Sequence, residues 1–174
     1  MIEDTLVLIK PDGVKRGLVG EIIGRFEKAG LKIVGLKLVK PAQNILEKHY
    51  PLLPEWVEGL GRKTRESFAK KGIKLKETDL QIATRVQRFL KKSLASGLIV
   101  AIVLRGPHAV EIVRKLIGST EPRQAMPGTI RGDFSIDAYD VADAEKRSVE
   151  NIIHASSSVE DARREIDVWF KKAN

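Results

Sequence analysis

The chain contains no cysteine and only three histidines, His49, His108 and His154. The absence of cysteine excludes disulfides, thiolate metal sites and cysteine nucleophiles, and so few histidines argue against a histidine-rich metal site. Long apolar runs are also missing, because the longest, Leu98 to Leu104, is too short to span a bilayer. We therefore expect no membrane-spanning segment and no membrane partner.

The usual phosphate-binding motifs are missing as well. No G-x-x-x-x-G-K-[ST] occurs, and no G-x-G-x-x-G follows a predicted strand. The tripeptide Asp133-Phe134-Ser135 lacks the glycine of the protein-kinase D-F-G motif, and no H-R-D precedes it. These absences exclude the common ATPase and protein-kinase interpretations.

What is present fits one globular domain of 174 residues, with 43% apolar and 31% charged residues. The N-terminal segment carries Glu3 and Asp4 where a signal peptide would carry basic residues. We therefore predict a single domain over residues 1–174 and a cytoplasmic location.

The net charge of +8 is concentrated in one segment. Residues 62–92 hold 11 Lys and Arg against 3 Asp and Glu, and the rest of the chain is neutral. Such a run is most often a solvated face. The alternative is a patch that binds the phosphates of a nucleic acid.

Hydrophobic periodicity and turn residues divide the chain into strands and helices. Strands are predicted over 5–9, 32–40, 98–104 and 134–138, and helices over 19–29, 43–50, 62–71, 79–94 and 107–117, with a last helix starting at the capping box of Ser157 and Glu160. Residues 119–129 and 139–150 are predicted loops. This order indicates a mixed α/β (α+β) sandwich with helices packed on a mostly antiparallel sheet.

Six polar residues at predicted strand ends and turns offer three cations, two hydrogen-bonding groups and one imidazole. They are Lys10, Arg114, Thr120, Arg131, Asn151 and His154. This set suits a triphosphate that is approached by a histidine nucleophile. Their spacing in the sequence does not by itself bring them together.

Four sequence blocks, in this order, resemble the nucleoside diphosphate kinase family. The blocks are Ile9-Lys-Pro-Asp-Gly-Val14, Arg16-Gly-Leu-Val-Gly-Glu-Ile-Ile23, Pro127-Gly-Thr-Ile-Arg-Gly-Asp-Phe134 and Asn151-Ile-Ile-His-Ala-Ser156. The resemblance implies a ferredoxin-like βαββαβ sandwich. It also implies transfer of the γ-phosphoryl group of a nucleoside triphosphate to a nucleoside diphosphate by a ping-pong mechanism.

The resemblance assigns a role to each matching residue. His154 would be the nucleophile that forms phosphohistidine, Glu165 would orient its imidazole, and Ser156 would supply a neighbouring hydroxyl. The other implied roles are phosphate binding for Arg114, Thr120 and Arg131, contact with the reacting phosphate for Lys10 and Tyr50, and contact with the ribose 3′-hydroxyl for Lys10 and Asn151.

The resemblance also implies Mg²⁺, carried on the nucleotide phosphates with few or no protein ligands, and assembly into a homo-hexamer or a tetramer. The resemblance is weakest for the residues that would contact the nucleotide base. Val86 stands where the family has an aromatic residue, so Phe89 and Leu90 are the candidates for the base clamp.

Two segments depart from the family pattern. A basic helical insertion is expected around 51–95, and the loop 139–150 is longer than the usual connection to the histidine block. We interpret His49 and His108 as structural, because neither belongs to a matching motif. The two hypotheses are a nucleoside diphosphate kinase and a nucleic-acid-binding protein that uses residues 62–92, and they are compatible.

Overall fold

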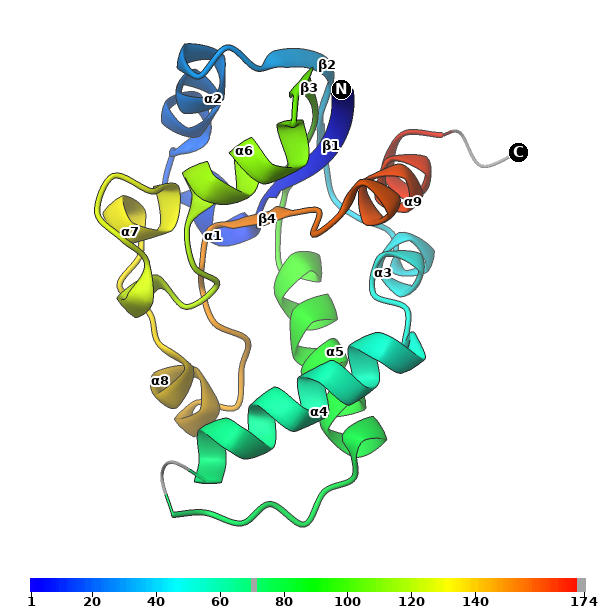
Figure 1. The fold of residues 1–174 in the computed structure, drawn as a ribbon, viewed down its shortest axis with the longest axis vertical. Helices are drawn as coiled ribbons and strands as arrows, with labels where there is room; N and C mark the ends of the chain where they lie inside the picture. Colours follow the sequence, from blue (N-terminus) through cyan, green and yellow to red (C-terminus); the bar gives the residue numbers. More distant parts are fainter. Residues whose placement is uncertain (70–71, 172–174) are drawn as a thin grey trace.

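The computed structural model describes residues 1–69 and 72–171, and its centre is a four-stranded sheet (Figure 1). The strands are β1 (Ile2–Ile9), β2 (Lys32–Val39), β3 (Ile99–Pro107) and β4 (Ile153–Ala155). Their order is β2-β3-β1-β4, and every neighbouring pair is antiparallel. This order is that of the predicted ferredoxin-like βαββαβ sandwich, with helices placed between β2 and β3.

Helices cover both faces of the sheet (Figure 1). On one face, α2 (Val19–Lys28) and α6 (Ala109–Ile117) bury apolar side chains such as Phe26 and Val113 against Ile102. On the other face, α3 (Gln43–His49) and α9 (Val159–Phe170) pack Leu46 and Trp169 against Leu8. β1 and β3 are therefore buried on both faces, which explains their continuous apolar sequences.

The insertion between β2 and β3 consists mainly of the helical hairpin α4 (Pro54–Ala69) and α5 (Asp79–Ala95) at one end of the molecule (Figure 1). Pro54 begins α4, because proline fits the first turn of a helix, so α4 starts eight residues before the predicted position 62. Residues 70 and 71, at the predicted end of that helix, lie outside the described residues. α5 starts close to its predicted position with a capping box of Thr78 and Gln81.

The prediction of a strand over 134–138 is wrong. Residues 130–134 form the short helix α7 (Ile130–Phe134), which Thr129 caps by accepting a hydrogen bond from the Gly132 N–H. Ile136 is 97% exposed and therefore cannot belong to a core strand. The fourth strand is β4, whose three residues are too few for a periodic signal.

The prediction that 139–150 is an irregular loop is also wrong in part, because it contains α8 (Tyr139–Ala144). Asp137 organises this segment: its carboxylate binds the Arg147 guanidinium at 2.6 Å and accepts a hydrogen bond from the Glu150 N–H. The many charged residues of this segment therefore bind one another instead of only water.

Smaller differences concern the ends of elements. The short helix α1 (Pro11–Lys15) follows β1, and the 119–129 segment, predicted as a loop, contains the 3-10 helix η1 (Pro122–Gln124). Pro107 ends β3 and does not begin the following helix. The last helix is capped by Ser158, one residue after the predicted Ser157, through the Asp161 N–H. Among the described helices, none is long and apolar enough to cross a membrane.

Candidate active site

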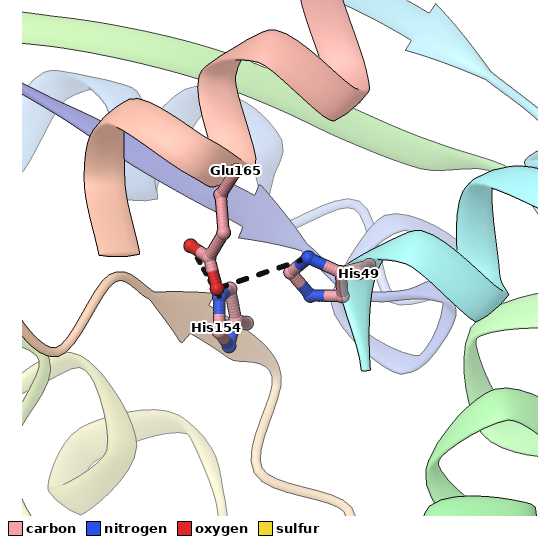
Figure 2. A group of neighbouring side chains, drawn as sticks. All are labelled: His49, His154 and Glu165. Carbon is pink, nitrogen blue, oxygen red and sulfur yellow. Dashed lines mark hydrogen bonds and ion pairs between the residues drawn. The ribbon is translucent and has the colours of Figure 1, made fainter. Parts of the chain in front are cut away.

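The site is built around His154, which lies on β4 opposite Leu8 of the buried strand β1. Its Nε2 atom is 3.2 and 3.1 Å from the two carboxylate oxygens of Glu165, which projects from α9 (Figure 2). The Glu165 side chain is 5% exposed, whereas that of His154 is 24% exposed. The imidazole is thus fixed on its Nε2 side and remains open to a substrate.

The charge of Glu165 determines which nitrogen of His154 carries the proton. Burial raises the pKa of Glu165, but the interactions with His154 and the hydrogen bond from Ser156 outweigh that effect and lower it to about 2. Ser156 Oγ donates a hydrogen bond of 2.6 Å to the same carboxylate. An ionised carboxylate only accepts hydrogen bonds, so His154 Nε2 carries the proton and Nδ1 presents a free lone pair.

A buried polar chain connects the end of β1 to the 119–129 segment. Lys10 Nζ donates to Asn151 Oδ1 at 2.9 Å and to the Val149 carbonyl at 3.2 Å, and Asn151 Nδ2 donates to the Thr120 carbonyl at 2.8 Å. Burial lowers the pKa of Lys10, and the nearby Asp12 carboxylate opposes this effect. Three predicted site residues, Lys10, Thr120 and Asn151, are therefore joined directly.

Arg131 contacts the backbone of the segment that carries His154. Its guanidinium donates to the carbonyls of Ile153 at 2.7 Å and Gly118 at 2.9 Å, and burial lowers its pKa to about 10. Arg114, exposed on α6, is close enough to lower the pKa of Arg131 further by charge repulsion. The two arginines thus form a positively charged neighbourhood next to β4.

A strained turn positions the residues that precede His154. Ile152 has a left-handed backbone with φ of 70°, which is unfavourable for a β-branched residue. Its N–H donates to the Asp12 carboxylate at 2.8 Å, and its carbonyl accepts from the Lys10 N–H at 2.7 Å. Gly13 packs so closely that an added Cβ would lie 2.8 Å from the Ile152 side chain. The Lys10–Gly13 block therefore shapes the turn that places His154.

Tyr50 enters the site from the end of α3, next to His49. Their ring centroids are 4.5 Å apart, and burial followed by the charge of Glu165 raises the pKa of the Tyr50 hydroxyl. His49 also contacts His154 edge to face, with ring centroids 4.6 Å apart (Figure 2). His49, interpreted as structural from the sequence, therefore lies within the group of side chains around His154.

The candidates for the base clamp are not brought into this group. Phe89 and Leu90 are half-buried on α5, and Arg88 lies over the Phe89 ring at 5.4 Å. α5 is connected to Tyr50 by a hydrogen bond from Gln87 Nε2 to the Tyr50 carbonyl and by Leu94, which belongs to the apolar cluster against which Tyr50 packs. The roles of Phe89 and Leu90 stay predictions.

Among the described residues, one group has metal-ligand spacing: His49, His154 and Glu165, whose ligand atoms lie within 4.8 Å of one another. Two imidazoles and one carboxylate do not form the oxygen-rich octahedron that Mg²⁺ prefers. This group is therefore not assigned to Mg²⁺, and a Mg²⁺ ion carried by the nucleotide phosphates stays a prediction.

Comparison with known proteins agrees with this geometry. A family model described as nucleoside diphosphate kinase matches residues 3–58 and 84–174. A nucleoside diphosphate kinase from Pyrobaculum aerophilum is 50% identical over 98% of this chain and 96% of its own length. The crystal structure of an NDP kinase from the same organism covers 99% of this chain and 97% of its own, with 48% identity and a TM-score of 0.93.

A more distant structure was solved with ligands. It is a transition-state mimic of nucleoside-diphosphate kinase from Borrelia burgdorferi with bound vanadate and ADP. The match has 36% identity and a TM-score of 0.81, and it covers 98% of this chain and 88% of that one. The chain described here belongs to the nucleoside diphosphate kinase family.

Proposed function

We propose that this chain transfers the γ-phosphoryl group of a nucleoside triphosphate to a nucleoside diphosphate through phosphohistidine at His154. The observation that carries the proposal is the pairing of His154 Nε2 with the buried Glu165 carboxylate. This pairing leaves Nδ1 unprotonated on a ring that a substrate can reach. A neutral imidazole with a free lone pair is the form that acts as a nucleophile.

In the first half-reaction, the lone pair of His154 Nδ1 forms a bond to the γ-phosphorus. The bond from that phosphorus to the β,γ-bridging oxygen breaks, and the nucleoside diphosphate leaves with the electron pair. In the second half-reaction, a terminal β-phosphate oxygen of the acceptor attacks the phosphorus, and the N–P bond breaks. Glu165 stabilises the positive charge that develops on the imidazole, because its carboxylate accepts the hydrogen bond of the Nε2 proton.

Binding and charge neutralisation are assigned to the surrounding cations. The phosphates would be held by Arg114, Thr120 and Arg131. The phosphoryl group that is being transferred would be contacted by Lys10 and Tyr50. Lys10 and Asn151 would also meet the ribose 3′-hydroxyl, and their hydrogen bond keeps both in one place. Phosphoryl transfer depends mainly on positioning and electrostatic stabilisation, which such a set provides. Mg²⁺ on the nucleotide would neutralise part of the phosphate charge.

We further propose that residues 1–174 form one catalytic domain into which the helices around 51–95 are inserted. The family model passes over residues 59–83, which lie in this hairpin. Assembly into a hexamer or a tetramer is supported by the edge strand β2, where Val34, Leu36 and Leu38 are 45–60% exposed. An apolar edge strand favours association with another chain. The cytoplasmic location stays a prediction from the N-terminal sequence.

Nucleic-acid binding by residues 62–92 is a second candidate function. Arg65 and Arg85 form ion pairs with Asp79 and Glu77, so the local acids neutralise part of the charge. Lys63, Lys74 and Lys76 are exposed and keep the surface basic. A basic surface of this kind is what binding to a phosphate backbone requires.

The decisive kinetic experiment compares His154→Gln with His108→Gln, which changes an exposed histidine at the start of α6. With GTP and ADP as substrates, His154→Gln should abolish transfer, whereas His108→Gln should match the unmodified protein. Initial rates of the unmodified protein should give parallel double-reciprocal lines, the pattern of a ping-pong mechanism. Intersecting lines, or an active His154→Gln variant, would contradict the proposal.

A further inference from the structure

His49 has no place in the reaction described above, yet it is buried against both members of the His154–Glu165 pair. Its residue is 2% exposed, and its Nδ1 atom lies 3.8 Å from Glu165 Oε1. Figure 2 shows the three side chains as one group, with His49 arriving from α3 and Glu165 from α9. An imidazole at this position is able to compete for the same carboxylate.

Trp169 determines the tautomer of His49. Its indole Nε1–H donates to His49 Nδ1 at 3.2 Å, and an indole N–H can only donate. Nδ1 of His49 therefore carries a lone pair, and the proton of the neutral ring is on Nε2. Burial lowers the pKa of His49 to about 3, so the ring is neutral at physiological pH.

This tautomer has a consequence for Glu165. Because Nδ1 of His49 carries no proton in this tautomer and accepts from Trp169, it cannot donate to the Glu165 carboxylate 3.8 Å away. The groups that do donate to it are His154 Nε2 and Ser156 Oγ, while Arg164 Nη2 stays 3.8 Å from Oε1. If the Trp169 N–H were absent, His49 could move its proton to Nδ1 and donate to Glu165 in competition with His154.

We propose that Trp169 is a positioning residue for the transfer reaction, because it holds His49 in the tautomer that reserves Glu165 for His154. This inference rests on the proposed role of His154. Trp169 acts through the His49 ring, which lies 3.8 Å from Glu165 Oε1 and meets the His154 ring edge to face. This tautomer of His49 destabilises the fold, because it leaves the Nε2–H as a buried donor without a partner among the described residues.

The test uses Trp169→Phe, alone and combined with His49→Phe, in the full chain. Trp169→Phe should lower the rate of phosphoenzyme formation from ATP–Mg²⁺ about tenfold, as expected when the partner of a reacting group is disturbed. Adding His49→Phe removes the competing imidazole and should restore the rate to within about threefold of the unmodified protein. A purely structural role predicts the reverse, because the double variant loses more packing and polar contacts.

A second readout follows the tautomers directly. Nitrogen-15 NMR of the histidine rings should show His154 protonated on Nε2 in the unmodified protein, a mixture of tautomers in Trp169→Phe, and recovery of the Nε2–H form in the double variant. Leu46→Val, in the same apolar cluster on α3, is the control for loosened packing and should leave the tautomer unchanged. Both phenylalanine variants must retain the cooperative thermal unfolding of the unmodified protein.

Two results would overturn the inference: a Trp169→Phe rate within twofold of the unmodified protein, or a double variant slower than Trp169→Phe alone. Should Trp169→Phe not fold, His49→Asn replaces it. Its amide oxygen can still accept from Trp169, so His154 should stay protonated on Nε2, and a tautomer mixture would contradict the inference. Failure of the proposed function would look different, because the unmodified protein would then form no phosphohistidine at residue 154.

Discussion

Lys10 and Asn151 are far apart in the sequence, and their side chains meet in a buried hydrogen bond of 2.9 Å. The same amide donates to the Thr120 carbonyl, so one side chain joins the end of β1 to the loop after α6. Buried polar groups that lose a partner cost more than the hydrogen bond had contributed. The two hydrogen bonds of Asn151 therefore link folding stability to the geometry of the site.

Asn151→Ala tests this link. The substitution leaves Lys10 Nζ with the Val149 carbonyl alone and should lower the free energy of unfolding by about 1–3 kcal/mol. Transfer activity should fall as well, because Lys10 loses a fixed position. Chemical denaturation and initial rates measure the two effects. Asn44→Ala, exposed on α3, is the control and should change stability by less than about 0.5 kcal/mol; equal effects of the two substitutions would contradict the account.

Glu165→Gln should slow phosphoenzyme formation without abolishing it. The amide still offers an acceptor to His154 Nε2 but lacks the charge that stabilises the developing imidazolium. We expect a loss of about 10- to 100-fold, measured by rapid quench with ATP–Mg²⁺. Glu160→Gln, in the exposed first turn of the same helix, should have no effect. An unchanged rate in Glu165→Gln would show that the carboxylate does not act on His154.

Stability should depend on pH through His49. Its pKa is about 3 in the folded chain, against the ordinary histidine value of 6.5 that applies when the chain is unfolded, so between these values the unfolded chain binds more protons at this residue. The contribution of neutral His49 is complete above pH 6.5 and is lost as the pH falls toward 3, by up to about 1.4 kcal/mol per pH unit. Between pH 6.5 and pH 5, the free energy of unfolding of His49→Phe should therefore fall by about 1–2 kcal/mol less than that of the unmodified protein. Urea titrations at several pH values test this, and parallel stability curves would contradict it.

The basic hairpin should be separable from catalysis. Changing Lys63, Lys74 and Lys76 to Glu alters side chains remote in sequence from the four family blocks. If these lysines contact nucleic-acid phosphates, the slope of log K against log salt should flatten by about 2–3 for an oligonucleotide, while transfer continues. An equal slope in both proteins would remove the nucleic-acid candidate. Loss of transfer would instead make the hairpin part of the nucleotide site.

The sequence predicted the fold and the site best where it carries a long apolar run or a family motif. The apolar run at Leu98–Leu104 predicted the central strand β3, and Pro127 to Phe134 identified the segment that carries Arg131. β4 could not be found by periodicity, because three residues show no repeat and its pairing partners on β1 lie at the other end of the sequence. The pattern around Ile136 was misleading, because alternation in an exposed connection resembles that of a strand.

The sequence predicted the individual residues of the site, but it did not predict the hydrogen bonds and packing contacts between them. No pattern in the sequence predicts that Lys10 Nζ donates a hydrogen bond to the Val149 carbonyl, because every residue carries a backbone carbonyl and its identity gives no signal. Trp169 follows Glu165 by one helical turn, so both lie on one face of α9, but the position of His49 on α3 depends on tertiary packing. Relationships of this kind arise only when distant elements meet.

The most direct test of the central claim is to isolate the phosphorylated protein. The purified chain is incubated with γ-labelled ATP and Mg²⁺, freed of nucleotide and digested for mass spectrometry. We expect an acid-labile phosphate on His154 that is absent from His154→Gln and that passes quantitatively to added GDP. Phosphate on another residue, or nucleotide conversion without any phosphorylated protein, would contradict it.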